Sequence, residues 1–387
     1  MRGGRPLRLT GRDPATGRTL RVLVEDGRIA EVRATDEPAE LWLAPGLVDL
    51  QVNGFAGHDV NAADVDETVV TELVHAVWRA GVTTVVPTIV TAPEEGIRTA
   101  LSAIARARAA DPLVAHTIPY AHVEGPFISA EDGPRGVHDP RYIRRADLDE
   151  LRRWGDLVGM LTVSPHDDAA IDLIAAAVRL GVRCAIGHTH ADPAQITRAV
   201  DAGAELSTHL GNGAHAMLPR HPNQLWTQLA DDRLYAGFIA DGHHLPADTF
   251  RAMLRAKGIE RSHLVSDTTA LGGMPPGRYR TAVGGEVELS EDGRLSYVGT
   301  PYLAGASRSL ADGVATAISM GDLTLSTALR LASANPGRFT GGRGVLRPGA
   351  PADLITFAWR PGDDGMTEAL ELPALGDEAA YRQAVAE

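Results

Sequence analysis

The feature that most constrains this chain is a repeated alternation of short apolar runs with amphipathic helical patterns, from near Leu47 to about Ser266. Parallel strands need long crossover connections, which are usually helices, so this alternation predicts an α/β fold with a parallel sheet. Eight runs have the composition of strands, at residues 43–53, 83–90, 117–124, 158–163, 183–187, 205–209, 234–240 and 263–266. Helical patterns cover 66–80, 94–110, 169–180, 193–202, 223–230 and 246–255, and two more follow at 307–320 and 324–334.

Eight strands with mostly helical crossovers indicate a (β/α)8 barrel of the TIM type. The alternative is a doubly wound open sheet, which usually carries a glycine-rich phosphate loop and then a helix after its first strand. Residues 52–58 provide neither feature. We therefore expect the barrel.

Strand patterns also flank the barrel at both ends of the chain. Residues 20–32 read as a hairpin that turns on Asp-Gly, and residues 349–359 return to a strand pattern. A further Asp-Gly hairpin is predicted at 284–297. We expect the two terminal segments, 1–44 and 342–387, to pack together as a small side domain, with the barrel at 45–341.

Composition restricts the partners and the compartment. The formal net charge of −13 disfavours nucleic acid and anionic membrane surfaces as partners. No run reaches the roughly 18 apolar residues of a membrane helix. Cys184 is the only cysteine, so we expect no disulfide framework and a reducing cytoplasm. Lys257 is the only lysine, which leaves no other residue for a Schiff base or a carbamylated metal bridge.

Polar side chains gather where the predicted strands end. In barrels of this type, functional groups lie at the carboxyl ends of the strands. The residues at those ends are Gln51 and Asn53 after the first strand, Glu124 after the third, His188 and His190 after the fifth, His209 after the sixth, His243 and His244 after the seventh, and Asp267 after the eighth. This concentration at one mouth of the barrel predicts an active site.

Three of these residues have the chemistry of metal ligands. Glu124, His188 and His209 offer one carboxylate and two imidazoles, which suit Zn²⁺ and leave a fourth position for water. A metal would lower the pKa of that water towards neutrality, and Asp267 would relay its proton to a leaving group. Each residue also has an ordinary structural interpretation, with Glu124 as a turn cap and Asp267 as a helix N-cap. Taken together, the set favours metal-assisted hydrolysis of an amide, ester or similar bond.

Several short motifs occur in a consistent order between about residues 20 and 360. They are APGLVDLQVNG at 44–54, HVEGPF at 122–127, GHT at 187–189, STHL at 207–210, IADGHH at 239–244, VSDT at 265–268, ANP at 334–336, GVLRPG at 344–349 and ADL at 352–354. As a set they resemble the N-acetylglucosamine-6-phosphate deacetylases of the amidohydrolase superfamily.

That resemblance implies a barrel with a small β-sandwich domain formed from both termini, and a homodimer. It assigns metal binding to the three ligands named above and makes Asp267 the catalytic aspartate. It also implies that His138 is a catalytic loop histidine that binds and polarises the substrate, and that His244 faces the substrate.

The resemblance also bears on the number of metal ions. Many amidohydrolases carry His-x-His after the first strand and hold two metals. This chain has Gln51 and Asn53 there, as the single-metal deacetylases do, and both count among its candidate substrate-binding residues. We therefore expect one divalent metal ion per chain, with Zn²⁺ preferred and Fe²⁺ or another ion as the alternative.

The sequence departs from the family immediately after the sixth strand. The family pattern is Thr-His-Leu, one residue, then Asn-Ala-Met, whereas residues 211–217 read Gly-Asn-Gly-Ala-His-Ala-Met. Either Asn212 matches the family asparagine with three residues inserted, or His215 replaces it, so both are candidate substrate-binding residues. The family's phosphate-binding arginine has Arg220 as its nearest counterpart. We expect this loop to determine specificity.

Three functions follow from these observations. The first is a metal-dependent deacetylase for an N-acetylated amino sugar, with N-acetylglucosamine 6-phosphate as substrate and glucosamine 6-phosphate and acetate as products. The second is an amidohydrolase that uses the same metal site on another N-acyl compound, a cyclic amide or a lactone. The third is a non-catalytic barrel that binds a ligand, which the intact set of polar strand ends argues against.

Overall fold

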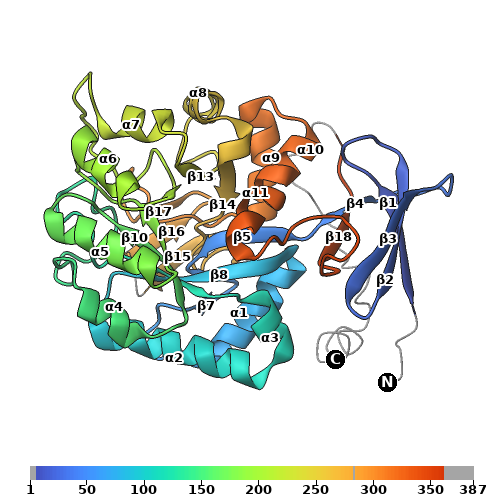
Figure 1. Cartoon of the computed structure of the whole chain (residues 1–387), viewed down its shortest axis with the longest axis horizontal. Coiled ribbons are helices and arrows are strands. Elements are labelled where there is room, and N and C mark those ends of the chain that lie inside the picture. The colour runs from blue at the N-terminus through green and yellow to red at the C-terminus, as the bar shows by residue number, and fades with distance from the viewer. Residues whose placement is uncertain (1–5, 282–283, 361–387) are drawn as a thin grey trace.

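The computed structural model describes residues 6–281 and 284–360, and its largest sheet has eight parallel strands that follow chain order (Figure 1). They are β5 (Leu47–Val52), β8 (Val82–Val90), β9 (Ala121–Glu124), β10 (Val158–Val163), β11 (Arg183–Ile186), β12 (Leu206–Ser207), β13 (Tyr235–Ile239) and β14 (Ser262–Val265). Each overlaps one of the eight strands expected from the sequence. The predicted (β/α)8 barrel is therefore confirmed.

The barrel closes where its first strand meets its last. Val52 and Thr268 form a parallel β-bridge just beyond β14. The N–H of Asp267 donates to the carbonyl of Gln51 at 2.9 Å. The N–H of Asn53 donates to the carbonyl of Thr268, also at 2.9 Å. This seam places the end of β5 directly beside the residues that follow β14.

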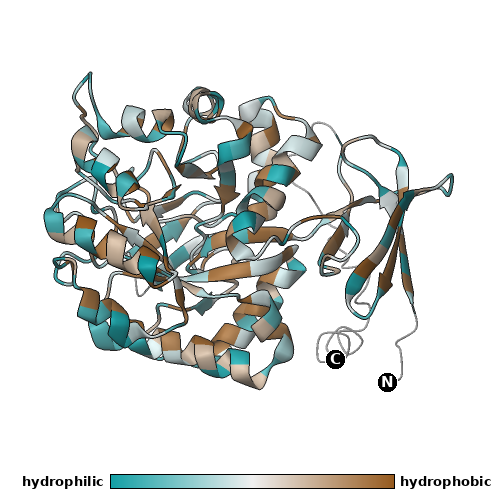
Figure 2. Cartoon of the chain, in the orientation of Figure 1, coloured by the Kyte–Doolittle hydropathy of each residue, from teal (hydrophilic) through white to brown (hydrophobic). Residues whose placement is uncertain are grey.

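Helices surround the sheet and turn buried apolar faces towards it (Figure 2). They are α1 (Glu67–Arg79), α2 (Glu94–Ala110), α3 (Pro112–Thr117), α4 (Leu148–Trp154), α5 (Asp168–Arg179), α6 (Pro193–Asp201), α7 (Gln224–Ala230), α8 (Ala247–Lys257), α9 (Leu310–Gly321), α10 (Leu325–Leu331) and α11 (Ala334–Gly337). Asp66, Asp167 and Asp192 cap α1, α5 and α6 by accepting backbone N–H groups. Within the described residues, none of the helices combines the length and apolar character that crossing a bilayer demands.

The structure corrects the sequence prediction on either side of the third strand. Residues 117–120 do not belong to that strand, because α3 ends at residue 117 and β9 begins only at residue 121. Asp111 caps α3, and Pro112 occupies its first position, where a missing N–H costs no hydrogen bond. The sequence prediction also omitted α4, which Asp147 caps.

A separate five-stranded sheet contains segments from both ends of the chain (Figure 1). Its order is β18 (Leu354–Phe357), β4 (Trp42–Pro45), β1 (Leu7–Arg12), β2 (Thr19–Glu25) and β3 (Arg28–Ala34). Trp42 donates its Nε1–H to the carbonyl of Trp359 at 2.9 Å, which ties the two ends together. The expected small β domain is confirmed as one sheet in the described residues. The limits 1–44, 45–341 and 342–387 remain a proposal, and residues after 360 lie outside the described part.

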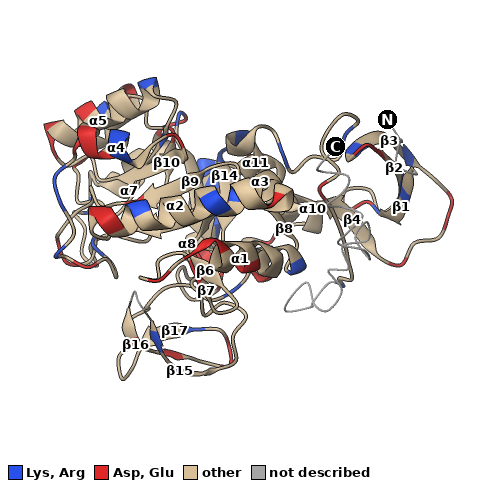
Figure 3. Cartoon of the chain, turned by 90° about the horizontal axis from the view of Figure 1, so that it is seen from below, with Lys and Arg blue, Asp and Glu red and all other residues tan. Residues whose placement is uncertain are grey.

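A third sheet follows the last barrel strand and stands away from the barrel body (Figure 3). It is antiparallel and consists of β15 (Gly277–Thr281), β16 (Gly285–Leu289) and β17 (Leu295–Tyr297). The hairpin predicted at 284–297 corresponds to β16 and β17. Arg278 and Arg280 lie in β15. A short hairpin of two strands with two residues each, β6 (Gly54–Phe55) and β7 (His58–Asp59), follows β5.

Lys257 is buried at the end of α8 and holds the end of the neighbouring helix α7. Its Nζ donates to the carbonyl of Gln228 at 2.8 Å and to the carbonyl of Asp231 at 2.7 Å. Carbonyl groups at a helix C-terminus lack intrahelical donors and attract a cation. Burial lowers the pKa of Lys257 to about 8. These contacts give the only lysine a structural role.

Lys257→Met is expected to lower the free energy of unfolding by about 1–3 kcal/mol, because it removes the donor of the buried Gln228 carbonyl and one of the two donors of the Asp231 carbonyl. Urea unfolding should show a lower midpoint with an unchanged m value. Arg255→Met removes an exposed cation from the same helix and should stay within about 0.5 kcal/mol of the parent protein. Equal losses in the two variants would contradict the assignment.

Candidate active site

The carboxyl ends of the barrel strands surround one cavity of about 230 Å³. Most of the site residues expected from the sequence line it, namely Asn53, Glu124, His138, His188, His209, Asn212, His244 and Asp267. Apolar side chains such as Val90, Ile239 and Leu303 complete the wall. The structure therefore brings together groups that lie far apart in the sequence.

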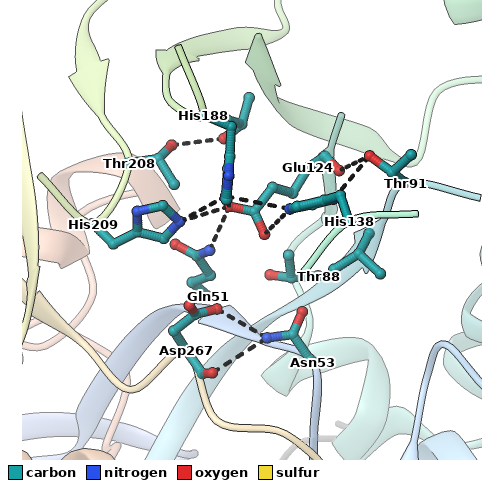
Figure 4. A network of polar contacts seen from close by, with 12 residues as sticks. Gln51, Asn53, Thr88, Thr91, Glu124, His138, His188, Thr208, His209 and Asp267 are labelled. Carbon is teal, nitrogen blue, oxygen red and sulfur yellow. Dashed lines mark hydrogen bonds and ion pairs between the residues drawn. The ribbon is translucent and has the colours of Figure 1, made fainter. Parts of the chain in front are cut away.

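Glu124, His188 and His209 form the centre of this cluster (Figure 4). Nε2 of His209 lies 3.1 Å from Oε1 of Glu124 and 3.0 Å from Nε2 of His188. Nε2 of His188 lies 3.3 Å from the same carboxylate oxygen. Donors bound at about 2.0–2.2 Å to a tetrahedral ion lie roughly 3.3–3.6 Å from one another, so the three atoms are almost at the spacing of a shared metal site.

The negative charge of Glu124 also fits a cation. Burial raises the pKa of Glu124, but His188 and His209 lower it further, and the net pKa lies well below its usual value. His188 contacts the carbonyl of Pro134 through Nδ1 at 2.9 Å. A carbonyl only accepts, so Nδ1 carries a proton, and Nε2 is the ring nitrogen that can offer a lone pair to a metal. Gln51 donates from Nε2 to Oε1 of Glu124 at 2.8 Å and orients the carboxylate.

The chain backbone is strained at three of these positions. His188, His209 and Asp267 have φ angles of 48°, 27° and 50°, in the left-handed region that residues other than glycine rarely adopt. Each residue lies two positions after the last residue of a barrel strand. Such conformations persist only where the surrounding structure fixes them, and they concentrate at functional sites.

His138 reaches the same cluster from the loop between β9 and α4. Its Nε2 lies 3.3 Å from Nε2 of His188 and 4.0 Å from Oε2 of Glu124. Its Nδ1 lies 2.9 Å from the hydroxyl of Thr91. Burial, together with nearby His188, lowers the pKa of His138 to about 3, so this imidazole is neutral. Within the described residues, Glu124, His138 and His188 also have ligand atoms within 4.8 Å of one another, so His138 is a further candidate ligand beside His209.

Asp267 lies beside this cluster and is held by β5. Asn53 donates from Nδ2 to Oδ1 of Asp267 at 2.9 Å and to the Asp267 carbonyl at 3.3 Å. Burial, with the negative charge of Glu124, raises the pKa of Asp267 to about 6. Asn53 and Gln51 were expected to bind substrate, and the structure shows both of them orienting other site residues.

The remaining predicted residues occupy different surroundings. His244 lines the cavity and contacts Oδ2 of Asp241 through Nδ1 at 2.6 Å. Asn212 also lines the cavity. His215 lies 2.9 Å from the exposed carboxylate of Glu131, and neither His215 nor exposed Arg220 is among the described residues that line the cavity.

The divergent loop after β12 packs directly on a candidate metal ligand. A Cβ atom on Gly213 would lie 2.9 Å from Nδ1 of His188, and one on Gly136 would lie 3.3 Å from its Cε1. Only glycine lets both loops approach the ring this closely. Asn212 and Gly213 of this loop line the cavity, whereas His215 is not among the described residues that do.

Several residues that support the site are not among those predicted from the sequence. Thr91 contacts His138, Asp241 contacts His244, and Asn61 lines the cavity while its side chain bonds the strand β8 backbone. Asp241 carried a usable signal, because it follows β13 at its carboxyl end. Threonine and asparagine are common in loops, so Thr91 and Asn61 could not be recognised as site residues from the sequence.

A (β/α)8 barrel with buried imidazole and carboxylate groups at its carboxyl mouth is the architecture of a metal-dependent hydrolase. The amidohydrolase family model matches residues 42–371. The chain therefore belongs to the amidohydrolase family, and it is a hydrolase.

Relatives narrow the comparison further. The chain is 32% identical over 348 residues to the N-acetylgalactosamine-6-phosphate deacetylase of Escherichia coli O157:H7, covering 86% of this chain and 89% of that protein. It is 33% identical over 339 residues to the N-acetylglucosamine-6-phosphate deacetylase of Danio rerio, covering 81% and 80%. A mutant N-acetyl-D-glucosamine-6-phosphate deacetylase from Mycobacterium smegmatis, solved with N-acetyl-D-glucosamine-6-phosphate, superposes with a TM-score of 0.82 at 30% identity, covering 92% and 95%.

Proposed function

We propose that this protein deacetylates an N-acetylated hexosamine 6-phosphate, releasing acetate and the free amino sugar. N-acetylglucosamine 6-phosphate is the substrate we favour. The observation that carries the proposal is the buried cluster of Glu124, His188 and His209 beside Asp267 in one cavity. Relatives named for N-acetylhexosamine-6-phosphate deacetylation, at about a third identity over most of the chain, support it.

The metal would be held by Glu124, His188 and His209, whose donor set fits one divalent cation. When bound, such a cation polarises a carbonyl group and makes a water molecule more acidic. We favour Zn²⁺ because two imidazoles and a carboxylate suit a borderline cation. The single ion follows from Gln51 and Asn53, whose amides are engaged with Glu124 and Asp267.

The chain's own residues would move protons and orient the substrate. Asp267 takes a proton from water and returns it to the leaving nitrogen of the amino sugar. Neutral His138 donates from Nε2 to the acetyl oxygen, and the contact between its Nδ1 and the hydroxyl of Thr91 at 2.9 Å holds the ring in place. His244, fixed by Asp241, offers Nε2 to a sugar hydroxyl.

A substrate panel tests this proposal. We expect N-acetylglucosamine 6-phosphate to give the highest kcat/KM, with N-acetylgalactosamine 6-phosphate next and both unphosphorylated sugars lower. Acetate release and free amine would be measured together. An inactive metal-loaded protein across all four sugars would overturn the proposal.

One observation favours a second candidate, the hydrolysis of an uncharged N-acyl compound. The described residues that line the cavity include no arginine or lysine, the usual partners of a phosphate. The same panel, extended with N-acetyl amino acids and a cyclic imide, separates the two. Higher kcat/KM on any of these than on both sugar phosphates would favour the second function.

Metal analysis gives a further prediction. Protein purified after Zn²⁺ loading and desalting is expected to hold one ion per chain, measured by plasma mass spectrometry against protein mass. Two ions per chain at full occupancy would contradict the single site.

A homodimer and a cytoplasmic location also remain part of the proposal. The free, buried thiol of Cys184 is compatible with a reducing cytoplasm.

A further inference from the structure

Asp49, in the middle of β5, is a buried acid that the proposed chemistry does not use. Asp49 is 1% exposed, and none of the described basic side chains forms an ion pair with its carboxyl group. Burial raises the pKa of Asp49 to about 7. Burying a carboxyl group away from any cation is unfavourable, so a specific contact must compensate for it.

That contact crosses the seam of the barrel. Both carboxyl oxygens of Asp49 accept the N–H of Ser266, at 3.2 and 3.3 Å. Oδ1 also accepts the N–H of Gln51 at 3.3 Å. The β-bridge between β5 and the chain after β14 forms only further on, at Val52 and Thr268. The Asp49 side chain therefore supplies an acceptor where the strand ladder does not.

Three consecutive N–H groups around Asp267 are satisfied in this way. Ser266 donates to Asp49, Asp267 donates to the carbonyl of Gln51 at 2.9 Å, and Thr268 donates to the Ser266 hydroxyl at 3.2 Å. Between them the chain turns through the left-handed φ of 50° at Asp267. A strained turn of this kind needs fixed groups on both sides.

We propose that Asp49 is a positioning residue for the reaction: by holding the N–H of Ser266, it fixes the left-handed turn that presents the Asp267 carboxylate to the metal-ligand cluster. The proposal rests on the hydrolytic role of Asp267 given above. Asp49 is not among the described residues that line the cavity, so its effect should fall on kcat and leave substrate binding and metal affinity unchanged.

Asp49→Asn and Asp49→Leu are a matched pair that share branching at Cγ, and only asparagine keeps an acceptor oxygen. We expect Asp49→Asn to retain kcat within about 5-fold and Asp49→Leu to lose about 30-fold or more, as loss of a positioning contact can. KM and the metal dissociation constant should change less than about 3-fold in both variants. Asp49→Ala replaces Asp49→Leu in the comparison if the leucine variant does not fold.

Hydrogen–deuterium exchange of the metal-free protein provides a readout that needs neither substrate nor metal. Exchange in the peptide that contains residues 266–268 should rise in Asp49→Leu and stay near the parent value in Asp49→Asn. Asp353→Asn removes another buried acid, which pairs with His116 at 2.7 Å beside the small sheet, and should leave kcat and this peptide unchanged.

Equal kcat and equal exchange in the asparagine and leucine variants would overturn the positioning role. A loss that appears in KM or metal affinity would also overturn it. If the parent protein hydrolyses no acetamido sugar, the proposed function fails, whereas the exchange comparison still decides whether Asp49 holds this turn.

Discussion

Asp267→Asn is expected to lower kcat by about 10²–10⁴-fold, the usual contribution of a general acid–base group. Asparagine keeps the oxygen that accepts from Asn53 at 2.9 Å, so the side chain should stay in place. Its amide cannot take up a proton from water at neutral pH. Metal content should be unchanged, because Glu124, His188 and His209 are intact. Steady-state kinetics and metal analysis on the same preparation measure both quantities.

Asp322→Asn is the matched control for this substitution. Asp322 also has a left-handed φ, 56°, but it is exposed at the end of α9, away from the cavity. The control variant should keep the parent kcat within about 2-fold, as surface substitutions usually do. Retention of full activity in Asp267→Asn would remove Asp267 from the mechanism.

The pH dependence of the parent enzyme checks the same residue. In its proposed role, Asp267 accepts a proton only when it is ionised, so activity should fall as the pH drops through its pKa. Burial and Glu124 raise that pKa to about 6 without a cation, and a bound cation favours the carboxylate. The acid limb of kcat/KM is therefore expected at or below pH 6. An identical limb in the residual activity of Asp267→Asn would assign it to another group.

His209→Ala should have the second large effect, a loss of metal affinity of at least about 100-fold. Even groups that only orient ligands change affinity by about 10–100-fold, so a ligand should matter more. The variant also removes the contact at 3.1 Å that favours the charged form of Glu124. Chelator competition gives the dissociation constant, and activity should follow metal occupancy.

His263→Gln provides the comparison for the loss of a buried histidine. His263 lies in β14 inside the barrel, and burial lowers its pKa to about 3. This variant should lose stability but bind metal with parental affinity. If His209→Ala bound metal as tightly as His263→Gln, the ligand assignment of His209 would be wrong.

Much of this site was predictable, because in a parallel barrel the residue at the carboxyl end of each strand lies at the same mouth. Glu124, His188 and His209 each follow an apolar run, and a parallel sheet brings the carboxyl ends of such runs to one edge. Periodicity alone was enough for that step. It gave no reason to select His138, which comes from a long loop, and only the family resemblance indicated it.

Other features depended on contacts that no local pattern encodes. Asp49 lies within an apolar run, and its partner, the N–H of Ser266, is 217 residues away. The sequence-based prediction also started the third strand at residue 117, because Thr117 and Ile118 have side chains that favour strands. Asp111 and Pro112 instead start a helical turn there, and those two local signals outweigh propensity.

The seam between β5 and β14 has a consequence for how the enzyme becomes active. The hydrogen bond from Asn53 to Asp267 joins residues 214 positions apart, so it forms only when the first and last barrel strands meet. Contacts across such long stretches of chain form against a larger loss of entropy than helices do. During refolding, catalytic activity should thus return later than the helical circular dichroism signal. The time course of recovered activity would then report when the barrel closes.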